Sequence, residues 1–263
     1  MNGRIVAFWS PGSPGVTTIA ANCAALLGQW ADRRTVAVDF NLTSPGLALN
    51  LGLFSRHTPL SLCLSTLLPG LISGSLTPEA LADSLPSVPE SPGLRVLAGL
   101  FRPLALEQID AVRVEQLLDY LAQQFDLVLV DLPSPIDYST TYITLEKADQ
   151  AFWLVSGQVG DRFHLRRYLS QDEALGLNHR ERAIVLNCPG PATARQVEFE
   201  LNQPVKAEVP WCPSLPSLLE QGLIPVLADG NYQGLAPFRK GIESVARLIA
   251  PSGVGKGVIK CRA

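Results

Sequence analysis

A glycine- and proline-rich segment near the start of the chain has the composition of a loop that binds phosphate. Residues 10–18 have the sequence SPGSPGVTT, between an apolar run at 5–9 and a helical pattern over 17–30. Successive backbone N–H groups of such a loop form a concave nest around phosphate, and the following helix N-terminus adds positive potential. The residues expected to contact phosphate are Gly12, Ser13, Gly15, Val16, Thr17 and Thr18. An ordinary strand-to-helix turn, with Gly and Pro for tightness, is the alternative.

This loop lacks the cation that the complete motif, G-x-x-x-x-G-K-[ST], directs at the phosphates. Val16 stands at the lysine position, and Pro14 has no backbone N–H to donate. A charge-assisted hydrogen bond contributes about 1.5–3 kcal/mol, so the loss of one lysine is expected to weaken nucleotide binding roughly 10- to 150-fold. The Thr17 hydroxyl remains available to ligate Mg²⁺.

The rest of the chain alternates short apolar runs with longer helical patterns, which is typical of repeated βαβ units. Strands are expected at residues 5–9, 35–39, 127–131, 151–156 and 183–187. Helices are expected at residues 17–30, 112–124, 161–174, 192–201 and 234–249, with Asp110 as the N-cap of the second. The pattern predicts an α/β fold, a doubly wound and mostly parallel sheet flanked by helices, in a single domain over residues 1–250.

Residues 54–92 interrupt this alternation, because Pro, Ser, Gly and Leu dominate and only short helical fragments stand out, around 61–68 and 78–85. We expect a partly helical excursion at the periphery of the sheet. It serves either as a partner-binding lid or as a plain surface connection. Residues 251–263 are expected to form a frayed C-terminal tail.

The order of these elements resembles the MinD/ParA branch of P-loop ATPases over nearly the whole chain, and within that branch the CpaE/TadZ-like proteins of pilus assembly. The phosphate loop of that family has a deviant motif, K-G-G-x-G-K-T-T, so Pro11 falls on its signature lysine and Val16 on its phosphate lysine. The sequence VAVDFN at 36–41 matches the family's V-D-x-D, with Asn41 in place of the second aspartate. The sequence FDLVLVDLP at 125–133 resembles its Walker B and switch II region.

The resemblance implies a site for ATP and Mg²⁺. Thr17, Asp39 and Asp131 would hold the metal, and Asn187 and Pro210 would contact adenine. Alternatively, Asp131 caps the turn after its strand, and Asn187 is a turn residue without a ligand. Because both lysines and the second aspartate are absent, ATP and Mg²⁺ are expected to bind weakly or not at all, with little or no hydrolysis, and no catalytic residue is assigned.

Composition narrows the classes of partner. The 263 residues are 47% hydrophobic and carry a formal net charge of −3, so nucleic acid is not expected as the main partner. Five scattered cysteines without a C-x-x-C pair predict neither a zinc site nor a disulfide framework. Without a leader, or an apolar run of about 18 residues, the chain is expected in the cytoplasm. The basic segment at 255–260 is too short and too weakly amphipathic to predict direct membrane binding.

The resemblance, together with the departures from its motifs, implies a homodimeric localisation or assembly scaffold for a pilus or secretion machine, recruited to a polar or membrane-associated assembly. The apolar residues expected at the dimer contact are Pro11, Pro14, Leu132, Pro133 and Ile136. If these residues pack within their own chain instead, the protein is expected to be a monomer. The alternatives are an active ATP switch that takes a cation from elsewhere, and a DNA-partitioning factor.

Overall fold

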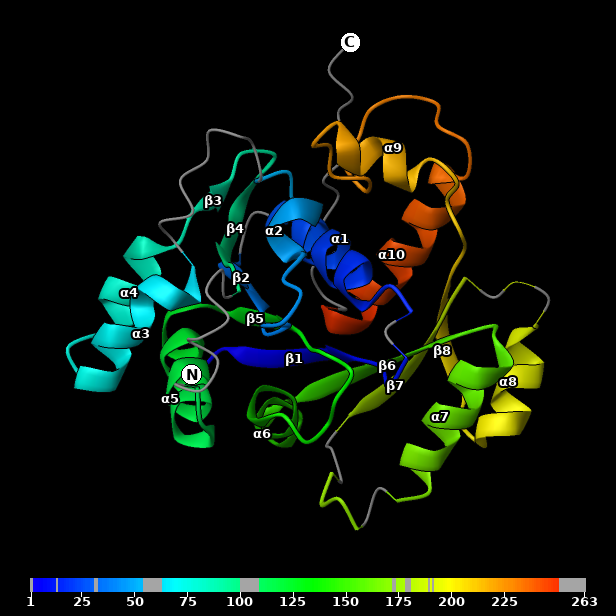
Figure 1. Ribbon diagram of the computed structural model, residues 1–263. Coiled ribbons are helices and arrows are strands. Elements are labelled where there is room, and N and C mark those ends of the chain that lie inside the picture. Colours follow the sequence, from blue (N-terminus) through cyan, green and yellow to red (C-terminus); the bar gives the residue numbers. More distant parts are fainter. Residues whose placement is uncertain are drawn as a thin grey trace.

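The computed structural model describes residues 2–12, 14–30, 33–53, 63–99, 109–171, 174–177, 181–188, 190 and 192–250. They form an eight-stranded sheet in the order β3-β4-β2-β5-β1-β6-β7-β8 (Figure 1). The strands are β1 (Arg4–Trp9), β2 (Thr35–Asp39), β3 (Ser87–Val88), β4 (Ser91–Leu97), β5 (Leu127–Asp131), β6 (Gln150–Ser156), β7 (Arg182–Asn187) and β8 (Val205–Val209). Neighbouring strands are parallel except for the antiparallel pair β3 and β4.

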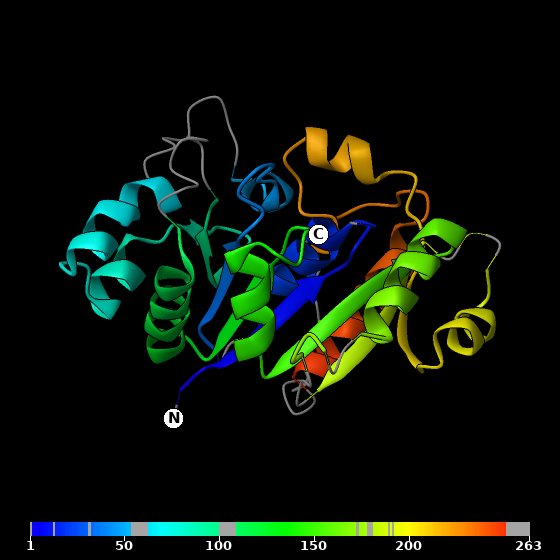
Figure 2. The same ribbon diagram turned by 60° about the horizontal axis from the view of Figure 1, so that its bottom comes forward.

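Helices cover both faces of the sheet (Figure 2). On one face lie α1 (Val16–Gly28), α2 (Leu47–Asn50), α9 (Leu215–Glu220) and α10 (Leu235–Ile249). On the other lie α3 (Leu64–Ser73), α4 (Pro78–Ser84), α5 (Ala111–Gln124), α6 (Ser139–Lys147), α7 (Val159–Leu169) and α8 (Ala194–Leu201). The molecule is therefore a three-layer single domain with one hydrophobic core on each side of the sheet.

The central strands are apolar along their whole length because both of their faces are buried. In β1, Val6 and Phe8 point into the core under α1, whereas Ala7 and Trp9 point into the core under α5. Phe8 stacks on Phe152 of β6 with ring centroids 5.2 Å apart, and Trp9 meets Trp153 edge-on at 4.9 Å on the opposite face. Such aromatic pairs contribute about 0.5–1.5 kcal/mol beyond their buried area, so they fix β1 beside β6.

The predicted fold class is confirmed, and the five expected strands are present within one residue at each end. Asp110 is the N-cap of α5, since its carboxylate accepts from Arg113 N at 3.0 Å. The expected helix at 161–174 is α7, which begins two residues earlier and ends at Leu169, where the backbone N–H of Ser170 caps the last turn.

Several elements were not predicted, for physical reasons. α6 has no apolar stripe because three of its buried residues are threonines. One of them, Thr144, can be buried because its hydroxyl donates a hydrogen bond to Thr140 O at 2.6 Å. β8 is a short edge strand, VKAEV, whose polar residues alternate with apolar ones. α2 and α9 are shorter than two turns, too short to show a periodicity.

The segment 54–92 contains α3 and α4 but also β3 and the start of β4. β3 pairs with β4, with Val88 opposite Ser91, and β4 pairs with β2, so the second half of the segment forms the edge of the sheet. Residues 54–62 and 251–263 lie outside the described residues, and the expected domain limits stay a prediction. No helix in the described ranges is both long and apolar enough to cross a membrane.

Candidate functional site

The phosphate loop lies between β1 and α1, at the carboxyl edge of the parallel strands. Because β1 lies between β5 and β6, the ends of these two strands flank the loop. Asp39 and Asp131 end β2 and β5, and Asn187 ends β7, so all three belong to the same edge. Open parallel sheets bind their ligands outside this edge.

The backbone of the loop keeps a left-handed turn and a free helix start. Gly15, with φ 72° and ψ 32°, immediately precedes α1, a conformation that only glycine adopts at no cost. No side chain among the described residues caps α1, so its first N–H groups can receive an anion. Gly12 N donates to the buried Ser10 Oγ at 3.2 Å. Ser13, expected to contact phosphate, lies outside the described residues.

Val16, at the position of the phosphate lysine, is a core residue. Its side chain is 3% exposed and belongs to the apolar cluster between α1 and the sheet. It can therefore offer a phosphate only its backbone N–H. Thr17 and Thr18 follow in the first turn of α1 and are half-buried.

Asp39 is buried and holds the turn after β2. Its Oδ1 accepts from Asn41 N at 3.1 Å, and its Oδ2 accepts from Gly46 N at 2.9 Å and from Leu47 N at 3.0 Å. Burial raises the pKa of Asp39 to about 7, although these three hydrogen bonds oppose the rise.

Asp131 lies directly beside Asp39, its partner in the register of β2 and β5. Both of its carboxylate oxygens are buried and neither accepts a hydrogen bond from the described residues. It therefore does not cap the following turn, which removes the alternative role for this residue. Burial, and then the charge of Asp39, raise the pKa of Asp131 well above its usual value. The Thr17 hydroxyl is close enough to lower that pKa, yet it makes no hydrogen bond of standard geometry.

Two buried carboxylates and a hydroxyl at a phosphate loop are oxygen donors of the kind that Mg²⁺ prefers. The partnerless oxygens of Asp131 fit a divalent cation, since a buried group of this kind is costly without a counter-charge. Within the described ranges, no group of three or more His, Cys, Asp and Glu residues could hold a metal by itself. A cation here therefore needs further oxygens from water or phosphate.

Asn187, expected to contact adenine, reaches the phosphate loop. Its Nδ2 donates to Pro14 O at 2.5 Å, so it bridges β7 and the loop. A Cβ at Gly15 would lie 2.8 Å from the same nitrogen, a second reason for glycine there. Pro210 follows β8 and is half-buried, and Cys188 N donates to Val209 O at 2.9 Å. The ends of β7 and β8 therefore lie side by side, as an adenine pocket made from both would require.

One residue near the loop escaped the sequence analysis. Asp161, in the first turn of α7, places its Oδ1 where a Cβ of Gly12 would clash with it. Ser156, the last residue of β6, donates to Asp161 Oδ2. The only hint in the sequence was an acidic residue just after a predicted strand. Its approach to the loop depends on α7, whose start was predicted too late.

The apolar residues expected at a dimer contact do not form one exposed face. Leu132 and Pro133 are buried within their own chain, and Ile136 is half-buried against the same core. For these three, packing within the chain is the outcome. Pro11 and Pro14 stay half-buried in the loop.

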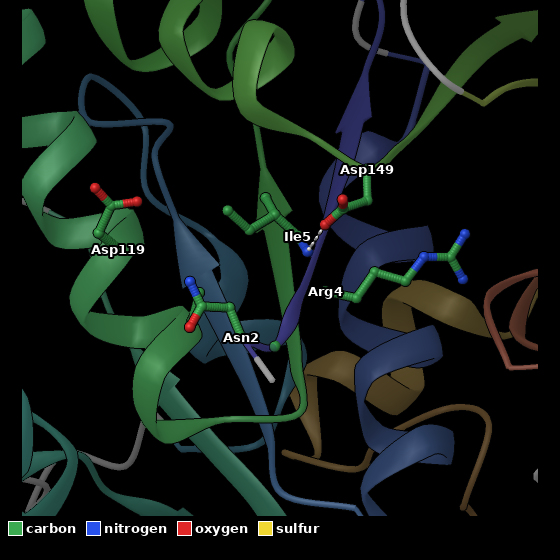
Figure 3. A pocket seen from close by; sticks show the side chains of 7 residues that line it. Asn2, Arg4, Ile5, Asp119 and Asp149 are labelled. Carbon is green, nitrogen blue, oxygen red and sulfur yellow. Dashed lines mark hydrogen bonds between the residues drawn. The ribbon is translucent and has the colours of Figure 1, made fainter.

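A separate cavity of about 330 Å³ opens at the opposite, amino edge of the sheet (Figure 3). Its carboxylates already have structural partners. Asp149 Oδ2 accepts from Ile5 N at 2.9 Å, and Asp119 pairs with Lys147 at 2.7 Å. This cavity is lined by groups that hold β1 in place, and it offers no set of reactive residues.

The sequence matches no protein-family model and no curated protein. Solved structures nevertheless resemble nearly all of the chain. A ParA family ATPase from Chlorobium tepidum TLS has a TM-score of 0.77 and 21% identity, over 93% of this chain and 98% of that one. MinD from Pyrococcus horikoshii OT3, complexed with Mg-ADP, has a TM-score of 0.73 and 20% identity, over 95% and 98% of the two chains. MinD in a MinC:MinD complex from Aquifex aeolicus has a TM-score of 0.72 and 18% identity, over 96% and 98%. The chain thus has the fold of MinD/ParA P-loop NTPases.

Proposed function

We propose that this protein binds a magnesium nucleotide weakly at the loop between β1 and α1, hydrolyses it little or not at all, and acts as a localisation or assembly scaffold. The observation that carries the proposal is the buried Val16 side chain at the position of the phosphate lysine. Phosphoryl transfer is catalysed by positioning and by cations that neutralise the transferring group. The loop offers backbone N–H groups for phosphate, and oxygen donors for Mg²⁺ lie beside it, but the loop has no cationic side chain.

Thr17, Asp39 and Asp131 would hold Mg²⁺ in this proposal, and Mg²⁺ would neutralise part of the charge on the phosphates. The loop N–H groups and the N-terminus of α1 would bind the phosphates, and Asn187 with Pro210 would contact the adenine. Asn41 takes the place of the carboxylate that orients the attacking water, and an amide cannot accept the proton. A bound nucleotide would then persist rather than turn over.

The scaffold role rests on the resemblance to CpaE/TadZ-like proteins, with a pilus or secretion machine as the partner. That MinD is found in a complex with MinC supports a partner-binding role for this type of fold. We also propose a homodimer that does not depend on ATP. In the family that this chain resembles, the signature lysine reaches across the dimer to the phosphates bound by the partner, and Pro11 cannot make that contact. Sedimentation with and without Mg-ATP tests this, and dimers that form only with nucleotide would contradict it.

Two measurements test the proposed site. Calorimetry should detect Mg-ATP binding only at high micromolar to millimolar concentrations, and phosphate release should stay at the level of a protein-free blank. The matched control is Asp131→Ala, which should abolish any contribution of Mg²⁺ to binding. A magnesium-dependent turnover that this substitution removes would instead establish the second candidate, an active ATP switch. The proposed Mg²⁺ ligands favour that candidate, since neither carboxylate oxygen of Asp131 has a hydrogen-bond partner among the described residues.

A further inference from the structure

A short turn directs an acidic side chain from α7 back onto the phosphate loop. Ser156 ends β6 and α7 begins at Val159, so Asp161 lies in the first turn of the helix. The Ser156 hydroxyl donates to Asp161 Oδ2 and accepts from Gln158 N at 3.1 Å. The carboxylate is thereby held in one orientation, with its second oxygen toward the loop.

The loop accommodates this carboxylate because residue 12 is glycine. Any Cβ at that position would overlap Asp161 Oδ1, so the carboxylate packs directly against loop backbone. The loop does not hold it through the N–H of Gly12, which donates to Ser10 Oγ instead. β5 and β6 lie on opposite sides of β1, so Asp161, which is positioned by β6 and α7, lies on the side of the loop opposite to Asp39 and Asp131.

No cation of the described residues neutralises this group. None of the ion pairs in the described part of the chain includes Asp161. The adjacent Arg162 is buried and engaged elsewhere, because its Nε contacts Glu200 Oε2 at 2.5 Å and its Nη1 donates to Gly157 O. Among the described residues, the negative charge of Asp161 thus acts on the loop without a paired counter-charge.

We infer that Asp161 sets the affinity and ligand preference of the loop: its carboxylate, fixed by Ser156 against Gly12, disfavours phosphate groups in proportion to their charge. The inference rests on the proposed nucleotide site. Like charges repel, and the repulsion between a half-buried carboxylate and a phosphate is less screened than that between two fully solvated charges. The loop is consequently selective against polyphosphate, beyond the loss of affinity caused by the missing lysines.

The test compares the ligands adenosine, Mg-ADP and Mg-ATP on the wild type and on Asp161→Asn. The amide keeps the size of the side chain and an acceptor for Ser156, but removes the charge. We expect Mg-ATP to bind about tenfold more tightly or better, with a smaller gain for Mg-ADP and none for adenosine, where tenfold corresponds to about 1.4 kcal/mol. A merely structural role would change all three affinities alike.

The matched control is Asp83→Asn, which makes the same change of charge at an exposed position of α4. It should leave all three affinities unchanged. Asp161→Ser, a second variant without the charge, should repeat the gain if Asp161→Asn proves unstable in a thermal melt. Equal affinities in the wild type and both Asp161 variants, together with tighter binding by Val16→Lys, would overturn this inference and leave the proposed site standing. Absence of binding by all of these proteins at millimolar Mg-ATP would overturn both.

Discussion

The two sides of the phosphate loop differ in what they can bind. On the β5 side, Asp39, Asp131 and Thr17 form a compact oxygen-rich set, and Asp131 has no other partner within the described residues. On the β6 side, Asp161 faces the loop, and Asn187 is bonded to the carbonyl of Pro14. The loop between them carries no lysine. If the proposed site is correct, cation binding and anion binding, which a P-loop normally combines, depend here on separate residues.

The largest expected effect on nucleotide affinity comes from restoring the missing cation. Val16→Lys should tighten Mg-ATP binding by about 1.5–3 kcal/mol, the contribution of a charged hydrogen bond. The lysine stem can stay along the apolar surface while its ammonium extends toward the loop. Calorimetry on both proteins measures the gain.

Val16→Met lengthens the side chain without charge and is the control for the Val16→Lys measurement. Because Val16 is a core residue, both variants are expected to lose some stability, which a thermal melt reports separately. Equal Mg-ATP affinities for the Lys and Met variants would show that the loop cannot place a cation on phosphate.

The second effect is a change in the stability of the ligand-free protein when Asp131, on the β5 side of the loop, is replaced. Asp131→Asn should raise the free energy of unfolding by about 1–3 kcal/mol at pH 7, because it removes a buried carboxylate that accepts no hydrogen bond from the described residues. Denaturant unfolding measures this change. Mg²⁺ at millimolar concentration should stabilise the wild type and not the variant. Should Asp131→Asn be less stable than the wild type, the carboxylate has a structural partner after all.

The third effect is a pH dependence in the absence of metal. The folded pKa of Asp39 is about 7, raised from 3.8, so the folded state binds this proton more tightly than the unfolded state. Its contribution to stability is fully present below pH 3.8 and is lost as the pH rises through about 7. The loss approaches about 1.4 kcal/mol per pH unit within this window.

Asp39→Asn isolates that contribution from the other titrating groups. Unfolding of both proteins at several pH values gives the difference between their slopes, and the wild type should lose more stability between pH 4 and 7. Parallel slopes would mean that Asp39 titrates at an ordinary pKa and that the site is wetter than its burial indicates.

The smallest effect is expected on the β6 side. Asn187→Ala removes the hydrogen bond to Pro14 O and should cost about 0.5–1.5 kcal/mol of stability. It should also weaken adenosine binding if the amide contacts the base. Gln196→Ala is the control, because it removes an exposed amide in α8, away from the loop. Asn202→Ala would be a poor control, since Asn202 has a φ of 51° and alanine would be strained there. A stability loss without a change in adenosine affinity would assign Asn187 to the loop alone.

The sequence by itself determined the layers of the fold and the edge at which the site lies. Short apolar runs predicted the strands that are β1, β2, β5, β6 and β7, and their alternation with helical patterns predicted a mostly parallel sheet flanked by helices. Asp39 and Asp131 could be proposed as site residues because each ends a strand, and the glycines because they lie in the loop between β1 and α1. The loss of the phosphate lysine could be predicted because the phosphate-loop motif places that lysine at the position of Val16.

Only the tertiary structure decided which polar groups have partners. Whether Asp131 caps a turn or stands alone depends on the packing of β2 beside β5, strands about ninety residues apart in the chain. Asp161 approaches Gly12, and Asn187 approaches Pro14, across even longer separations. Local periodicity carries no information on such contacts, since hydrogen bonding and charge proximity follow from the distance in space between side chains and not from their order along the chain.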